Sequence, residues 1–123
     1  MVLVESLQDL TQSAEAASVT VEVTPLTLQD VQAATLDFEI TLSTHAVELA
    51  YDLTQIVVLR DDQGNEYRPA SWEGPTGGHH VAGVLRFADR ATILQSGVTE
   101  VELDLQGIAD VPSRLFRWDV PQE

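Results

Sequence analysis

The sequence predicts an all-β protein, an immunoglobulin-like antiparallel β-sandwich of seven to nine short strands. Two observations lead to this prediction. Apolar and polar residues alternate with a period of two in several segments, as they do in strands that bury one face. Clusters of glycine, proline, asparagine and aspartate separate these segments, as expected for turns. No segment has the periodicity of a long helix, and a small barrel is the alternative architecture.

The strands expected first along the chain lie at 19–24, 36–42 and 47–53. In each of them, apolar side chains occupy every second position and mostly polar or acidic side chains lie between them. The continuous apolar run at 56–59 is expected to be a central strand, because both faces of such a strand are covered.

The run Asp61-Asp62-Gln63-Gly64-Asn65 predicts a hairpin turn, because these residue types tolerate left-handed backbone angles. Its return strand is expected at 66–72. Further strands are expected at 81–87, 100–105 and 115–120. Calcium binding by the turn is a weaker alternative, since its acids do not follow the spacing of an EF-hand loop.

The length of 123 residues predicts one domain, with a sandwich at 19–123 and a separate N-terminal segment at 1–18. Leu3, Leu7 and Leu10 fall at helical spacing in that segment. An edge strand near 6–11 followed by a loop is the reading we prefer, because the rest of the chain is β. The first five residues have no basic residue, so we expect no signal peptide there.

The composition excludes several functional classes. Twenty acidic residues face six basic ones, giving a net charge of −14, so nucleic acid and anionic membrane surfaces are unfavourable partners. Cysteine is absent, which excludes disulfides, thiol nucleophiles and iron–sulfur clusters. No apolar run reaches the roughly 18 residues of a membrane span, so we expect no membrane insertion by this domain.

The segment Ser71–His80 holds the candidate site. The adjacent His79 and His80 offer imidazole nitrogens, which suit zinc or copper, and His45 follows a predicted strand and could supply a third ligand. Loop carboxylates could add to such a site; these are Asp52, Asp61, Asp62 and Glu73. The alternative is that the histidines cap strand ends or form hydrogen bonds with the loop backbone.

Trp72 and Glu73 are the candidate binding residues beside these histidines. An exposed Trp72 could form a platform for a sugar or a peptide, whereas a role in the core is the preferred alternative. We identify no catalytic residue and expect no enzyme, since the nucleophile elbow, the phosphate loop and the dinucleotide fingerprint are all absent.

Three stretches together resemble uncharacterised β-sandwich modules of prokaryotic extracytoplasmic proteins, over roughly residues 19–120. The stretches are Ser-Thr-His-Ala-Val-Glu-Leu at 43–49, the turn region at 59–67, and the Trp-Glu-Gly-Pro, Gly-Gly-His-His and Gly-Val-Leu-Arg-Phe sequences at 72–87. The resemblance implies an immunoglobulin-like module at the cell surface or in the periplasm, within a longer anchored or secreted protein. It supplies no activity and no site residue.

The sequence therefore predicts a non-enzymatic extracytoplasmic module that binds an unknown protein or a small ligand through its histidine-containing loop. A purely structural or assembly domain without a ligand is the alternative, and a small hydrolase is the third hypothesis. A homo-oligomer is compatible with either of the first two, because sandwich edges can pair with another chain.

Overall fold

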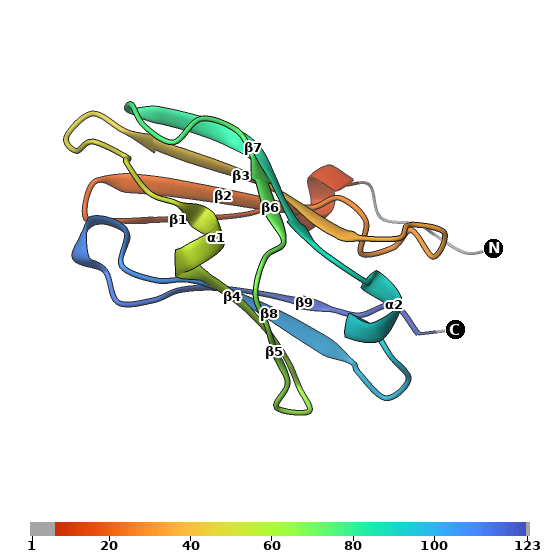
Figure 1. The fold of residues 1–123 in the computed structure, drawn as a ribbon. Helices are drawn as coiled ribbons and strands as arrows, with labels where there is room; N and C mark the ends of the chain where they lie inside the picture. The colour runs from red at the N-terminus through yellow and green to blue at the C-terminus, as the bar shows by residue number, and fades with distance from the viewer. Residues whose placement is uncertain (1–6, 123) are drawn as a thin grey trace.

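The computed structural model describes residues 7–122 and consists of two antiparallel β-sheets packed face to face (Figure 1). The first sheet has the strand order β1-β2-β3-β7-β6, and the second has the order β5-β4-β8-β9. These nine strands confirm the prediction of an all-β sandwich. The first sheet contains β1 (Gln12–Ala16), β2 (Val19–Pro25), β3 (Leu36–Thr44), β6 (Ser71–Glu73) and β7 (His80–Phe87). The second contains β4 (Val57–Asp61), β5 (Glu66–Tyr67), β8 (Glu100–Leu105) and β9 (Arg114–Asp119).

The helical elements are single turns at the ends and sides of the sandwich. They are the 3-10 helices η1 (Leu7–Leu10) and η2 (Ile108–Asp110) and the α-helices α1 (Leu53–Ile56) and α2 (Arg90–Ile93). A membrane-spanning helix needs far more apolar residues than any helix within residues 7–122 contains.

The core lies between the two sheets and follows from the alternating sequence pattern. In β3, every second side chain from Leu36 to Thr44 is buried, and the residues between them face outwards. The ring of Phe38 meets the edge of the Phe87 ring, with centroids 5.8 Å apart, and lies 5.5 Å from the Trp118 ring. Aromatic contacts of this kind join β3 and β7 of the first sheet to β9 of the second.

The strand predicted at 47–53 is wrong. Residues 45–52 have no regular structure and lead into α1, and β4 begins at Val57 rather than at residue 56. The carboxylate of Asp52 accepts a hydrogen bond from the backbone N–H of Thr54 at 3.0 Å, which caps α1. Leu49 and Leu53 are still buried. The apolar residues of this segment therefore reach the core from a loop and a helical turn.

The return strand predicted at 66–72 is divided between the two sheets. Glu66–Tyr67 pairs with β4 in the second sheet, whereas Ser71–Glu73 pairs with β7 in the first. The chain crosses from one sheet to the other at Arg68-Pro69-Ala70. Pro69 suits this crossing, because proline has no backbone N–H to contribute to a ladder.

The edge strand predicted near 6–11 lies further along the chain. Residues Leu7–Leu10 form η1, and the edge strand is β1 at Gln12–Ala16, while the part of that prediction on residues 1–6 lies outside the described residues. Ala17 and Ser18 both have positive φ, 51° and 64°. Two consecutive residues of this kind form a tight hairpin turn, which directs this alanine-rich segment back along β2.

Side chains join the two sheets along the side where β1 and β9 form the edges. The side-chain amide of Gln12 donates to the backbone carbonyl of Arg117 and accepts from its N–H at 3.3 Å. The indole of Trp118 donates to the carbonyl of Leu10 at 2.7 Å. These bonds occupy part of the β9 edge without adding a strand to it.

Candidate functional site

Trp72 lies at the side of the core and fixes the loop that follows it. Its indole N–H donates to the carbonyl of Pro75 at 3.0 Å, and its half-buried ring packs against the core. A Cβ added at Gly83 would lie 2.9 Å from this ring and 2.3 Å from the carbonyl oxygen of Glu73. Glycine is required at this position because β6 and the Trp72 ring approach the backbone of β7 so closely.

The structure joins two loops that carry His45 and His79, residues 45–49 and 74–79, which we call the histidine loops. The backbone N–H of Thr44 donates to the carbonyl of His79 at 2.9 Å, and that of Leu49 donates to the carbonyl of Gly78 at 2.9 Å. The Glu48 carboxylate accepts from the N–H of Gly78 at 2.7 Å. The histidine loops therefore lie side by side at one end of the sandwich (Figure 1).

The three histidines are exposed and lie in different parts of this end of the sandwich. His80 begins β7, and its Nδ1 lies 3.0 Å from the hydroxyl oxygen of Ser43. His45 follows the end of β3. Over residues 7–122, no group of three or more histidine, aspartate or glutamate side chains is arranged to hold a metal ion. The contact between His80 and Ser43 matches the alternative in which these residues make strand-end hydrogen bonds.

Glu73 lies on the outer face of the first sheet and makes an ion pair. Its carboxylate is 2.8 Å from the guanidinium of Arg86, which also contacts Asp37 at 3.1 Å. The hydrogen bond and charge of Asp37, followed by the contact with Glu73, raise the pKa of Arg86. Glu73 is thus part of a surface charge network, and Trp72 points to the other face of the same strand.

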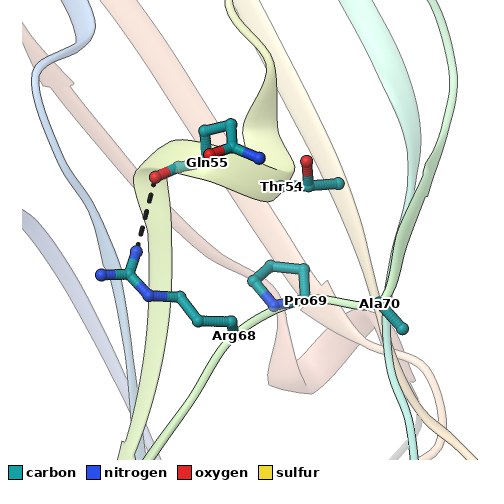
Figure 2. Close-up of a pocket in the computed structure, with 5 residues that line it drawn as sticks. All are labelled: Thr54, Gln55, Arg68, Pro69 and Ala70. Atoms are coloured by element: carbon teal, nitrogen blue, oxygen red, sulfur yellow. Dashed lines mark hydrogen bonds between the residues drawn. The ribbon is translucent and has the colours of Figure 1, made fainter.

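One hollow lies where the chain crosses between the sheets, and Figure 2 shows its lining. It has a volume of about 480 Å³ and lies between α1, which supplies Thr54 and Gln55, and the Arg68-Pro69-Ala70 crossing. The guanidinium of Arg68 points towards the carbonyl of Gln55, with a long contact of 3.4 Å. The lining is mostly polar, so this hollow offers little apolar surface to a ligand.

A second hollow, which we call the Arg90 groove, has a volume of about 550 Å³. It is bounded by the loop before β3, by α2 with the segment that follows it, and by the residues after β9. Figure 1 shows α2 at the end of the sandwich opposite the histidine loops. Its larger apolar lining residues are Leu28, Val31, Leu94, Val98, Val120 and Pro121.

The Arg90 groove carries a positive charge. The Arg90 guanidinium donates to the backbone carbonyls of Thr27 at 2.7 Å and Leu28 at 2.6 Å. None of the described residues that line the groove is an aspartate or a glutamate. The ion pairs found among residues 7–122 engage other arginines, namely Arg60, Arg86 and Arg117. Within residues 7–122, Arg90 therefore has no carboxylate partner.

Sequence reasoning missed the Arg90 groove, because its lining comes from three separate parts of the chain. The only sequence signal is that Arg90 and Val31 stand in segments outside the alternating strands. Leu28, Val98 and Val120 form a buried floor, whereas Val31 at the rim is 63% exposed. Val31 therefore adds apolar surface at the rim of the groove.

Comparison with known proteins gives a fold relationship. The chain matches no family model, and no curated protein matches it. Among solved structures, it is similar to the crystal structure of a DUF4426 family protein from Pseudomonas aeruginosa PAO1, with a TM-score of 0.50 and 10% sequence identity. The match covers 91% of this chain and 99% of that one. DUF4426 is an uncharacterised family, and at this identity the likeness shows that the two proteins share a β-rich fold.

Proposed function

We propose that this chain is a non-enzymatic binding module that takes an apolar ligand with one negatively charged group in the Arg90 groove. The observation that carries the proposal is the lining of that groove. Among the described residues, the groove combines an apolar floor with an arginine that has no carboxylate partner, and no acidic residue lines it, in a chain of net charge −14. Elsewhere the acidic surface repels such a ligand, so the groove is the favourable place for it.

The dimensions of the groove support this proposal. Small-molecule sites have volumes of about 300–1,000 Å³ and are mostly apolar, with a few polar groups that fix the ligand. At about 550 Å³, the Arg90 groove falls within this range. The loops that form it are attached to the sandwich, and loops on a rigid scaffold commonly carry binding residues.

The proposal includes an immunoglobulin-like module that works outside the cytoplasm, as part of a longer anchored or secreted protein. This part is supported by the resemblance of residues 43–49 and 59–87 to extracytoplasmic modules, and the two-sheet architecture is compatible with it. Zinc or copper binding at His45, His79 and His80 stays a prediction of the sequence. The alternative function is a structural or assembly domain without a ligand.

The test is a fluorescence titration with 1-anilinonaphthalene-8-sulfonate, which combines aromatic rings with one sulfonate. We expect saturable binding at about one molecule per chain, with a Kd on the order of 10–100 µM. The substitution Val31→Asp places a carboxylate at the rim and removes apolar contact surface. It should weaken binding by about tenfold or more, because the new charge repels the sulfonate.

Leu115→Asp is the matched control. Leu115 is also a large apolar residue in solvent, 48% exposed, but it lies on the outer face of β9, away from the groove lining. This variant should bind the probe as the unsubstituted protein does. Absence of saturable binding, or equal loss in both variants, would show that the groove is not a ligand site and would favour the structural alternative.

A further inference from the structure

We propose, beyond the ligand function, that β1 is a dimerisation edge at which two copies of this chain pair antiparallel strands. Every residue from Ser13 to Ala16 is exposed. Ala14 and Ala16 pair with Val21 and Val19, both 0% exposed, so their side chains lie on the inward face of the sheet. Since these alanines are nevertheless exposed, no strand of the second sheet covers this part of β1.

The other edges of the two sheets are short or occupied. β5 has two residues and β6 has three, which limits the ladder that another chain could form with them. β9 has six residues, but Gln12 and Leu10 accept or donate hydrogen bonds along it. By contrast, no described residue outside β2 forms a hydrogen bond with the backbone of Ser13, Ala14 or Glu15.

The sequence of β1 lacks most of the features that usually protect an edge strand, and its one charged residue is Glu15. The strand Gln-Ser-Ala-Glu-Ala contains no proline and no lysine. Its register with β2 runs without interruption from Gln12 to Ala16, so it has no bulge. Three of its five side chains are small, namely Ser13, Ala14 and Ala16, so an approaching backbone meets little steric hindrance there. Such an edge offers unpaired N–H and C=O groups to another strand.

The preferred occupant is a second copy, because β1 is complementary to itself. Antiparallel pairing centred on Ala14 places Ser13 opposite Glu15 of the second copy and Gln12 opposite its Ala16. The like charges of the two Glu15 side chains are then not directly opposite, and the Ser13 hydroxyl can donate to the opposing carboxylate. The two alanines at the symmetry axis allow close approach. The product is one continuous ten-stranded sheet, since each first sheet has five strands.

The dimer is expected to be weak and to depend on salt. A five-residue strand pairing buries less than the roughly 1,200 Å² of a stable interface. Each copy carries a net charge of −14, so the copies repel at low ionic strength, and screening should strengthen their association. This salt dependence is opposite to that of a dimer held by ion pairs.

The test is sedimentation equilibrium of the full chain at up to about 1 mM protein, at low salt and near 0.5 M NaCl. The unsubstituted protein should self-associate, and more strongly at the higher salt concentration. Ala14→Lys places two ammonium groups opposite each other at the axis and should weaken association at least tenfold. Ala50→Lys makes the same change of charge on an exposed loop residue and should not weaken it.

A charge-swap mixture makes the test independent of any effect on folding. Ala14→Glu alone should be monomeric, and so should Ala14→Lys alone, whereas a mixture of the two should form heterodimers through the opposite charges at the axis. A monomeric unsubstituted protein at high salt, an equal effect of Ala14→Lys and Ala50→Lys, or no heterodimer in the mixture would each overturn the proposal.

Discussion

Asp61 shows how one carboxylate organises the turn that the sequence predicted. Its side chain accepts hydrogen bonds from the backbone N–H of Gln63 at 2.9 Å and of Asn65 at 3.0 Å, and from the Asn65 amide at 2.9 Å. Burial alone would raise the pKa of Asp61, but the hydrogen bonds from Asn65 and Gln63 outweigh it and lower the pKa. The ionised form therefore holds the hairpin together.

The substitution Asp61→Asn should reveal this contribution through its pH dependence. Because the pKa of Asp61 is lower in the folded state, the stabilisation is complete above the unfolded value, near 3.8, and is lost as the pH falls through the folded value. We expect the variant to lose about 1–2 kcal/mol of unfolding free energy at neutral pH. The loss should shrink below the folded pKa, as measured by urea unfolding over a pH series.

Asp119→Asn provides the control, because Asp119 is exposed on β9 and its side chain makes no ion pair or hydrogen bond within residues 7–122. It should show little difference from the unsubstituted protein at any pH. A loss in Asp61→Asn that is the same at neutral and acid pH would mean that the carboxylate charge does not stabilise the turn.

The sequence shows that glycines cluster in the β6–β7 loop and at the start of β7, but it does not show why they are needed there. Gly74 and Gly83 are needed where they stand because the Trp72 ring lies against both, and a Cβ at Gly74 would come within 2.7 Å of it. That contact depends on β6 pairing with β7, which local spacing does not reveal. The preferred core role of Trp72 agrees with its packing against the core. Whether the three histidines lie together depends on the tertiary structure, which local sequence patterns do not reveal.

At the level of elements, Arg114 connects three parts of one end of the sandwich. Its guanidinium donates to the carbonyls of Ala16 at 3.0 Å, Val19 at 3.2 Å and Ile108 at 3.1 Å. The residue is 5% exposed, and burial lowers the pKa of the guanidinium. Through Arg114, β9 is bonded to the β1–β2 hairpin and to η2.

We expect Arg114→Met to lower the unfolding free energy by about 2–4 kcal/mol, because it removes three charged hydrogen bonds, two of which are buried. Hydrogen exchange should also become faster in the β1–β2 hairpin. Arg117→Met, at a side chain that is 59% exposed, should cost about 0.5 kcal/mol or less, although it breaks an ion pair with Glu102. Equal destabilisation by the two substitutions in a denaturant titration would contradict this assignment.

The strands with uninterrupted alternation could be predicted from the sequence. Those expected at 19–24, 36–42, 100–105 and 115–120 correspond to β2, β3, β8 and β9. The prediction failed at 47–53 because the bond from Asp52 to the Thr54 N–H starts a helical turn, and one turn is too short to show helical periodicity. It failed at 66–72 because the pattern does not show which sheet a strand will join.

Over the whole molecule, the few arginines on the sheet faces are concentrated in ion-pair networks. On the second sheet, Glu66, Arg60, Glu102 and Arg117 form a row across all four strands, with neighbouring charges of opposite sign. Arg60 also contacts the buried Asp104 at 3.0 Å. The chain has twenty acidic residues and six basic ones, and in the part that the structure describes most carboxylates lie outside these networks.

Screening should therefore stabilise the folded state. We expect the Tm to rise by a few degrees between about 10 mM and about 0.5 M NaCl, because salt weakens repulsion among the unpaired carboxylates. The double variant Glu22→Gln with Glu39→Gln removes two exposed charges from the first sheet. The double variant should have a higher Tm at low salt, and its Tm should rise less with added NaCl, as measured by calorimetry. A Tm of the unsubstituted protein that falls with added NaCl would refute the expectation.

The Arg90 groove could not be predicted, because it exists only at the scale of the whole fold. Arg90 reaches the carbonyls of Thr27 and Leu28, which lie 63 and 62 positions away in the sequence. Another wall of the groove comes from the residues after β9. No local pattern relates these three segments, and the absence of lining carboxylates is visible only once the segments are brought together.

The crossing at Arg68-Pro69-Ala70 has a consequence for biosynthesis. The strand β7 pairs with β3 through partners as far apart as Leu36 and Phe87, and the intervening chain contributes β4 and β5 to the opposite sheet. During translation, β1, β2 and β3 can form a meander as they emerge, but the first sheet is incomplete until Phe87 has left the ribosome. The second sheet then waits for β8 and β9. Neither sheet is encoded by a contiguous stretch, so the chain has no half that could fold first and act as a template for the other.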